Sequence, residues 1–115
     1  MNKKNKAGYI PNRGDIVWIN FEPQKGKEIA KVRPALTISK KEYNKHGLAI
    51  MCPITSKIKG YPFEVVINHQ KISGAILADH IRNLDWKERK AKLIAKIDED
   101  KITEVLGLVG VILKP

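Results

Sequence analysis

The chain has 115 residues, a length that favours one domain with a single core. Hydrophobic residues make up 43% and charged residues 30%, a balance that argues against global disorder. No apolar run approaches the roughly 18 residues of a membrane span, and the N-terminus lacks the apolar segment of a signal peptide. We therefore expect a cytoplasmic protein with a basic, frayed N-terminal arm, residues 1–12, before one domain, residues 13–115.

The formal net charge is +10, which favours polyanionic partners such as nucleic acid or an acidic protein. A single cysteine, Cys52, excludes an intrachain disulfide and lies in an apolar run typical of a core. The histidines, His46, His69 and His80, show no metal-ligand spacing. Because no Gly-rich phosphate loop is present either, we expect neither a metal nor another cofactor.

Short runs rich in β-branched and aromatic residues follow one another along the chain. They predict strands over residues 16–21, 34–39, 48–54, 63–67, 74–79, 80–86 and 91–97. Residues 40–47 are polar and predict one helical turn that ends at Gly47. Pro53 predicts an edge position or a bulge for its strand, because proline has no N–H to donate within a sheet.

The C-terminal segment changes period. Asp98 is a good N-cap, and apolar residues from Ile102 to Leu113 then repeat at helical spacing. Gly107 and Gly110 weaken this helix, unless they permit close packing on the sheet or on a second subunit. Short strands at close spacing with one final helix predict a mainly β fold, a small barrel or a strongly bent sheet.

Polar residues with catalytic potential are scattered between these elements. Glu28 is close in sequence to Arg33 at the entrance of a strand, although on charge pattern alone a solvated loop with a weak ion pair is the simpler interpretation. Thr55 and Ser56 follow a buried strand, so their hydroxyls can project from a rigid frame or simply form a turn. Asp79 at a strand end can act as a base or cap a turn.

Aromatic residues are interleaved with the basic ones, and such rings can stack on unpaired bases. They are Trp18, Phe21, Tyr61, Phe63 and Trp86. For Trp18 and Phe63, the hydrophobic surroundings in the sequence favour a core position over a binding role.

Several motifs occur in a fixed order along the chain: Gly14-Asp15-Ile16-Val17-Trp18, Lys25-Gly26-Lys27-Glu28 to Arg33-Pro34-Ala35, Cys52-Pro53-Ile54-Thr55-Ser56, Lys59-Gly60-Tyr61-Pro62-Phe63-Glu64-Val65 and Leu77-Ala78-Asp79-His80. Together they resemble the MazF/PemK/Kid family of toxin endoribonucleases, over nearly the whole chain from about Gly14. The resemblance implies a small SH3-like β-barrel with a C-terminal helix, usually as a homodimer. It also implies metal-independent cleavage of single-stranded RNA, and inhibition by a cognate antitoxin with an acidic tail.

Residue by residue, the resemblance places catalysis on Arg33 and Thr55, with Glu28 at an acidic loop position. Members with a functional aspartate at the position of Asp79 carry an arginine two residues earlier, where this chain has Leu77, and this departure shifts the weight to Arg33 and Glu28. We expect the substrate to contact a wider set of residues: Lys27, Lys31, Ser56, Lys57, Lys59, Tyr61, Asp79 and His80.

The resemblance implies that the RNA's own 2′-hydroxyl attacks the adjacent phosphate, which leaves a 2′,3′-cyclic phosphate and a 5′-hydroxyl. Two alternatives use the same scaffold without this chemistry. One is a non-catalytic RNA binder. The other resembles the gyrase-poison toxins that share the fold, and it would act on a topoisomerase complex rather than on RNA.

Overall fold

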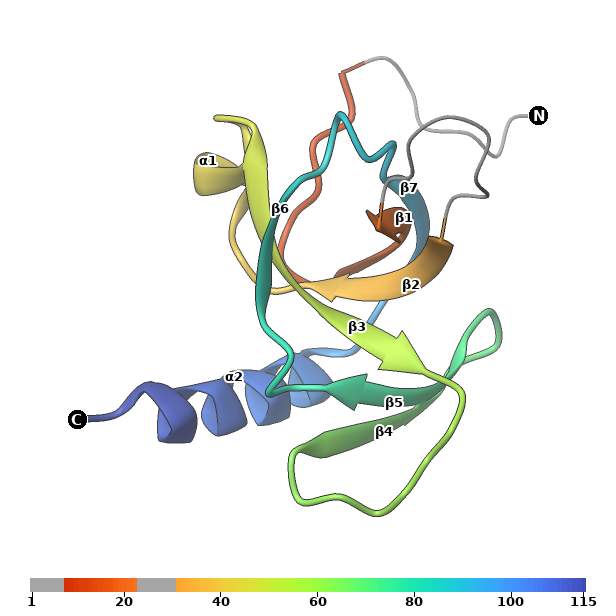
Figure 1. Ribbon diagram of the computed structural model, residues 1–115, viewed down its shortest axis with the longest axis vertical. Coiled ribbons are helices and arrows are strands. Elements are labelled where there is room, and N and C mark those ends of the chain that lie inside the picture. The colour runs from red at the N-terminus through yellow and green to blue at the C-terminus, as the bar shows by residue number, and fades with distance from the viewer. Residues whose placement is uncertain (1–7, 23–30) are drawn as a thin grey trace.

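The computed structural model describes residues 8–22 and 31–115 (Figure 1). All of the predicted strands and the C-terminal helix are confirmed, with shifts of a few residues at their ends. The strands are β1 Asp15–Glu22, β2 Lys31–Thr37, β3 Leu48–Thr55, β4 Glu64–Asn68, β5 Ser73–Leu77, β6 Arg82–Asp85 and β7 Lys92–Lys96. The helices are α1 Lys41–Asn44, which is the expected helical turn, and α2 Glu99–Leu113.

In the described part of the chain the strands form one antiparallel sheet in the order β4-β5-β3-β2-β1-β7, and β6 pairs with β3 beside this path. The end strands β4 and β7 do not pair with each other among these residues. The mainly β fold with a C-terminal helix is therefore confirmed, but the sheet is strongly bent rather than closed into a barrel. The helix α2 packs against β4 and covers the core at this opening (Figure 1).

Pro53 lies inside the sheet, so the prediction of an edge position or a bulge is wrong. On one side, β3 pairs with β2, where Pro53 is opposite Ala35. On the other side, β3 pairs with β6 over residues 48–51 and with β5 over residues 54–55. Pro53 falls where the strand changes partner on that side, and a residue without an N–H is tolerated there.

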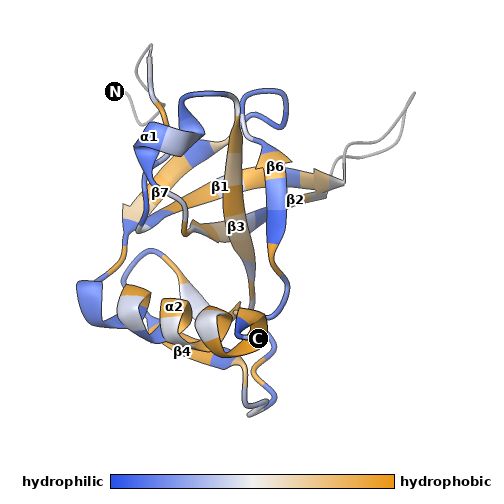
Figure 2. Cartoon of the chain, turned by 90° about the vertical axis from the view of Figure 1, so that its left-hand side faces the viewer, coloured by the Kyte–Doolittle hydropathy of each residue, from blue (hydrophilic) through white to orange (hydrophobic). Residues whose placement is uncertain are grey.

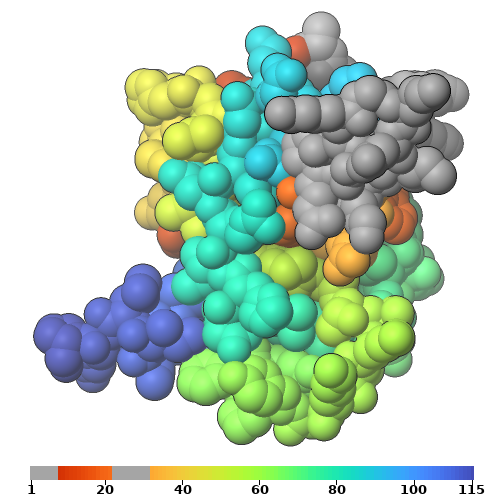
Figure 3. Space-filling view, in the orientation of Figure 1, coloured from red at the N-terminus to blue at the C-terminus, as the bar shows by residue number. Residues whose placement is uncertain are grey.

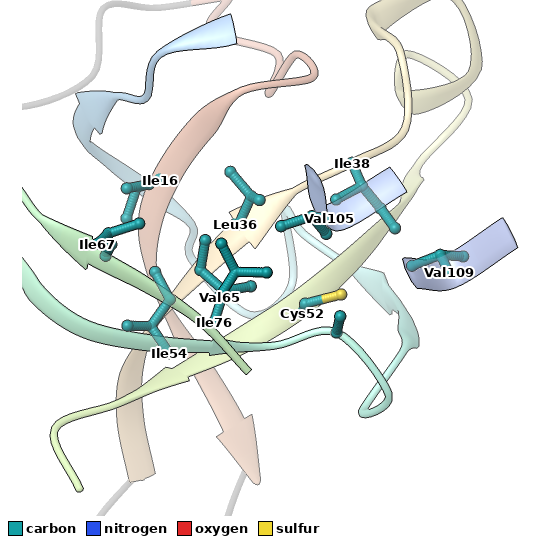
Figure 4. Close-up of a cluster of buried hydrophobic side chains, with 11 residues drawn as sticks. Ile16, Leu36, Ile38, Cys52, Ile54, Val65, Ile67, Ile76, Val105 and Val109 are labelled. Atoms are coloured by element: carbon teal, nitrogen blue, oxygen red, sulfur yellow. The ribbon is translucent and has the colours of Figure 1, made fainter. Parts of the chain in front are cut away.

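The main core joins the sheet to the C-terminal helix. Figure 4 shows this cluster, in which Val105 and Val109 of α2 pack with side chains from five strands, β1 to β5. The other members are Ile16, Leu36, Ile38, Cys52, Ile54, Val65, Ile67, Ile76 and Ala78. Cys52 is fully buried, as predicted. A second cluster on the other face of β1 contains Val17, Ile19 and Phe21, so this strand is covered on both faces.

The last turn of α2 projects away from the sheet. Figure 3 shows this end standing out from the body, and its residues Val111 and Leu113 are 64% and 69% exposed. Asp98 is the N-cap residue, as predicted, but its side chain makes no capping hydrogen bond. A Cβ added at Gly107 or Gly110 would contact nothing within 4 Å. These glycines therefore do not serve close packing on the sheet within the described chain.

The described N-terminal residues are anchored to the domain. The Tyr9 hydroxyl donates a hydrogen bond of 2.7 Å to Oδ2 of Asp15, and the Asn12 backbone N–H donates to the same oxygen. Pro11 is fully buried. The expected frayed arm is therefore wrong for residues 9–12, because these contacts hold them, while residues 1–7 lie outside the described part. None of the described helices has the length and apolar character needed to cross a membrane.

Candidate active site

A hollow of about 330 Å³ opens where the beginning of β2 meets the end of β3. Because these strands are antiparallel neighbours, the first residues of one lie beside the last residues of the other. This pairing brings together three predicted site residues, Arg33, Thr55 and Ser56. The remaining lining residues are Trp18, Pro34, Ile54, Ile72 and Ser73. Arg33 and Thr55, far apart in sequence, thus face a common space.

Arg33 is exposed and forms no ion pair with any described residue. Its backbone is fixed, because it lies opposite Ile19 in the pairing of β2 with β1. Its guanidinium also borders a second, smaller hollow of about 170 Å³. A planar fork of donors on a rigid strand and without a partner among the described residues is well suited to bind an oxyanion such as a phosphate.

Thr55 ends β3 and is held by its neighbours on two sides. Its hydroxyl oxygen accepts a hydrogen bond of 3.1 Å from the backbone N–H of Lys57. On the β5 side, a Cβ at Gly74 would overlap with the carbonyl oxygen of Thr55, and the φ of Gly74 is +146°. Only glycine allows this close approach, so Gly74 positions Thr55. Gly74 could not be identified from the sequence, since its role depends on strand register.

The loop after Thr55 is shaped by the carboxylate of Glu64. Its oxygens accept hydrogen bonds from the backbone N–H groups of Gly60, at 3.0 Å, and of Lys59, at 3.2 Å. The predicted substrate-binding side chains of this loop, Lys57, Lys59 and Tyr61, are exposed. The loop therefore carries two ammonium groups and an aromatic ring on a backbone that Glu64 holds, and its first residue, Ser56, lines the Arg33 hollow.

Asp79 is not among the residues that line the Arg33 hollow. The Tyr61 hydroxyl hydrogen-bonds to its carboxylate, and this bond together with the negative charge raises the pKa of Tyr61. Oδ1 of Asp79 lies 3.8 Å from Nε2 of His80 and accepts no hydrogen bond from a described residue. Burial, with a contribution from Asp79, raises the pKa of the Cys52 thiol to about 12. Within residues 8–22 and 31–115, no three His, Cys, Asp or Glu side chains gather as metal ligands would.

The second hollow lies on the other side of Arg33. It brings the predicted residue His80 next to Arg33, with Phe21, Pro53 and Arg82. The Arg82 guanidinium stacks over the Phe21 ring, 5.5 Å from its centroid. Nothing in the sequence singled out Arg82, and Phe21 was one of several aromatic residues, so their pairing could not be predicted.

Trp18 is 43% exposed, so its predicted core position is wrong. It lies on β1 opposite Pro34, and its ring borders the Arg33 hollow. Ile16, two residues earlier on the same strand, belongs to the main core, but Trp18 does not, because the Arg33 hollow opens beside Trp18. The stacking role that the interleaving of aromatic and basic residues suggested for this ring stays a prediction. Phe63 is half-buried and packs its ring at 5.9 Å from that of Tyr61.

Three predicted residues cannot be placed as side chains. Glu28 and Lys27 lie outside the described residues. Lys31 begins β2, where its backbone pairs with Glu22, and its side chain is not among those described. Their roles remain predictions.

Comparisons with known proteins converge on one group. The model of a family described as PemK-like, MazF-like toxin of type II toxin-antitoxin system matches residues 12–113. The chain is 36% identical over 106 residues to the endoribonuclease toxin MazF of Escherichia coli strain K12, which covers 91% of this chain and 96% of that protein. It is also 30% identical over 100 residues to the E. coli endoribonuclease toxin ChpB, covering 82% and 86% of the two chains.

Solved structures agree with the sequence matches. The crystal structure of MazF from Deinococcus radiodurans superposes with a TM-score of 0.83 at 46% identity, covering 93% of this chain and 99% of that one. A crystal structure of MazE–MazF from the same organism gives a TM-score of 0.85 at 48% identity, with coverage of 91% and 96%.

Proposed function

This chain belongs to the PemK-like, MazF-like toxins of type II toxin–antitoxin systems, and we propose that it is a metal-independent endoribonuclease that cuts single-stranded mRNA in the cytoplasm. One observation carries the proposal: the sheet brings the Arg33 guanidinium and the Thr55 hydroxyl to a common hollow, in a chain whose relatives are named endoribonucleases. The net charge of +10 favours a polyanionic substrate. Residues 13–115 are the toxin domain in this proposal, after an arm of residues 1–12.

Arg33 stabilises the transition state in this reaction. The RNA's 2′-oxygen bonds to phosphorus and the bond to the 5′-oxygen breaks, which requires no metal and no outside nucleophile. Extra negative charge develops on the phosphoryl oxygens between these steps. The exposed planar fork of Arg33 donates hydrogen bonds to those oxygens.

Thr55 and Glu28 supply the remaining chemistry. The Thr55 hydroxyl donates to the same phosphoryl oxygens, from a position that Gly74 and Lys57 hold. Glu28 takes the 2′ proton as general base, and the 5′-oxygen gains a proton as it leaves. The products are a 2′,3′-cyclic phosphate and a 5′-hydroxyl. DNA lacks the 2′-hydroxyl and is not cut.

The substrate is guided by the loops around the hollow. Ser56 borders the hollow, Lys57 and Lys59 bring positive charge, and Tyr61 offers a ring on which an unpaired base can stack. His80 contacts the RNA from the second hollow, while Asp79 acts through Tyr61. We assign substrate contacts to Lys27 and Lys31 as well, on the sequence alone.

We also propose an acidic antitoxin and a second copy of this chain as partners. A solved relative is named as a MazE–MazF complex. An acidic antitoxin segment would compete with RNA for the same cationic loops. The exposed apolar end of α2, with Val111, Ile112 and Leu113, offers surface for a homodimer contact.

Incubating the purified protein with a long mixed-sequence RNA in the presence of EDTA tests the proposal. Mapping the ends should reveal discrete cuts at a recurring short motif, with 5′-hydroxyl ends and no cuts by an Arg33→Ala variant. Intact RNA from a folded, antitoxin-free sample would contradict the nuclease. Trapping of gyrase on DNA by that same sample would instead identify a gyrase poison, and RNA binding alone a non-catalytic binder.

A further inference from the structure

A third hollow, which is also basic, is separate from the Arg33 hollow and from the smaller hollow beside Arg33. It has a volume of about 380 Å³ and is formed by three segments that are distant in sequence, residues 8–10, 45–47 and 86–87. These segments meet beside α1 and the β6–β7 connection, which Figures 1 and 2 both place at the end away from α2 and β4. No residue lines both this hollow and the Arg33 hollow.

Two aromatic side chains line this hollow, and each is held in place by a hydrogen bond from its only donor group. The Trp86 indole N–H donates to the backbone oxygen of Asn44 at 2.7 Å, and the Tyr9 hydroxyl donates to Asp15 at 2.7 Å. Asn44 is itself fully buried and donates to the backbone oxygen of Pro11. Both rings are half-buried, so each presents only apolar ring surface to the hollow from a rigid position.

The groups around these rings are cationic or neutral. Lys45, Lys87 and His46 line the hollow and are exposed. Among the described residues, neither ammonium group forms an ion pair, and no carboxylate lines the hollow. Fixed flat rings beside unpaired ammonium groups match a ligand that is both planar and anionic.

We propose that this hollow binds a nucleotide of the single-stranded RNA outside the segment that is cut, with the base against Trp86 and the phosphate between Lys45 and Lys87. The inference rests on the proposed function, since it extends the path of the same substrate. Stacking on an aromatic ring and phosphate contacts by lysine are the means by which proteins hold single strands of any sequence. The volume lies within the range of small-ligand sites. An acidic peptide would engage the ammonium groups but would leave the ring surfaces without a partner.

The two tryptophans of the chain allow each hollow to be monitored separately. Trp18 borders the Arg33 hollow and Trp86 borders the third hollow, so their indole N–H signals in ¹⁵N NMR spectra report on different sites. The probe is a mixed-sequence 2′-O-methyl RNA of about sixteen nucleotides, which cannot be cut because its 2′-oxygens are blocked. We expect both indole signals to shift on titration.

The Lys45→Gln/Lys87→Gln double variant should lose the shift of Trp86 and keep that of Trp18. Its affinity for the probe should fall about three- to tenfold, and the salt dependence of log K should flatten by about 0.7, the value for one neutralised phosphate of a single strand. The matched control is Lys101→Gln/Lys114→Gln, which removes the same charge from α2 and the C-terminus and should leave the Trp86 shift intact.

A probe that shifts Trp18 but not Trp86 would overturn the proposal. So would an equal loss of affinity in the control, because net charge would then explain the effect. An acidic peptide that shifts Trp86 where the RNA does not would assign the hollow to a protein partner instead. Cleavage of ordinary RNA is measured separately, so a protein that binds at both tryptophans without cutting would contradict the nuclease and leave this inference standing.

Discussion

Asp15 and Asp79 are both carboxylates largely withdrawn from solvent, but their surroundings differ in kind. The Asp15 side chain is 3% exposed, and its two oxygens accept hydrogen bonds from Tyr9, Asn12 and Lys96. The Asp79 side chain is 23% exposed, and its buried Oδ1 accepts no hydrogen bond among the described residues. The first carboxylate is saturated by the fold, while the second keeps capacity for another donor.

The arginines repeat this contrast. Arg89 donates to the backbone oxygens of Asn20, at 3.1 Å, and Phe21, at 2.6 Å, and so ties the β6–β7 connection to β1. Arg33 has no such partner among the described residues and borders two hollows. Charged groups that have hydrogen-bond partners within the fold, such as Arg89, contribute to its stability. Charged groups without such partners among the described residues, such as Arg33, are available to a substrate.

Replacing Arg33 with alanine should have the largest effect, and only on activity. Loss of a donor to the phosphorane should lower the single-turnover cleavage rate by at least about 10² to 10³-fold. The urea midpoint should stay unchanged, since no described partner is lost. Arg89→Ala is the matched control, and it should cost about 1–3 kcal/mol of stability while the folded fraction still cuts RNA. Equal loss of stability in both variants would abolish the distinction.

Thr55→Ala should raise the barrier to cleavage by about 2–4 kcal/mol, because a hydroxyl that donates to the developing charge is removed. Single-turnover kinetics with saturating enzyme measure this loss without interference from product release. Thr103→Ala, on an exposed position of α2, serves as control and should cut at the normal rate. Unchanged kinetics of the Thr55 variant would remove this residue from the site.

Asp15→Ala should lower the free energy of unfolding by about 2–3 kcal/mol, because donors from Tyr9 and Asn12 lose their acceptor at a site with little access to water. Urea denaturation with a constant m-value provides the measurement. The control is Asp98→Ala, since this N-cap side chain makes no capping hydrogen bond and its loss should cost little. A similar cost for both aspartates would show that the network around Asp15 contributes nothing beyond a surface carboxylate.

Comparing Gly74→Ala with Gly47→Ala distinguishes the cost of backbone strain at positive φ from the cost of a steric clash of the new Cβ. Both glycines have positive φ, +146° and +117°, so alanine strains the backbone at each. Only at Gly74 would the new Cβ overlap with Thr55, whereas at Gly47 it meets nothing within 4 Å. We expect the Gly74 variant to be less stable than the Gly47 variant by about 2 kcal/mol and to lose cleavage as Thr55 shifts. Equal stability and activity of the two variants would exclude Gly74 as a positioning residue.

The role of Gly74 marks the limit of prediction from this sequence. The spacing of apolar residues and the local composition were sufficient to predict the strands and α2, because alternation and helical spacing are properties of residues close in sequence. The family motifs led to Arg33 and Thr55, which the structure places at one hollow. The exposure of Trp18 and the interior position of Pro53 depend instead on strand register and on where the core ends. Neither property can be predicted from the residues adjacent in sequence.

The smallest predicted effect concerns the phenol that Asp15 holds. Burial, followed by the hydrogen bond to Asp15, raises the pKa of Tyr9 well above its usual value. Above pH of about 10 the unfolded chain therefore releases this proton while the folded chain keeps it, so the unfolded state binds fewer protons and stability falls as pH rises. Tyr9→Phe should cost about 1 kcal/mol at neutral pH.

Above a pH of about 10, Tyr9→Phe should also flatten the decline of stability by up to about 1.4 kcal/mol per pH unit. Urea titrations across this range measure both slopes. Tyr61→Phe extends the contrast, because hydrogen bonding to Asp79 raises the pKa of Tyr61 too, but its ring is 47% exposed and its surroundings are solvated. Its removal should change the slope less than that of Tyr9. If the two variants changed the slope equally, the saturated network at Asp15 would be no better shielded from water than the open one at Asp79.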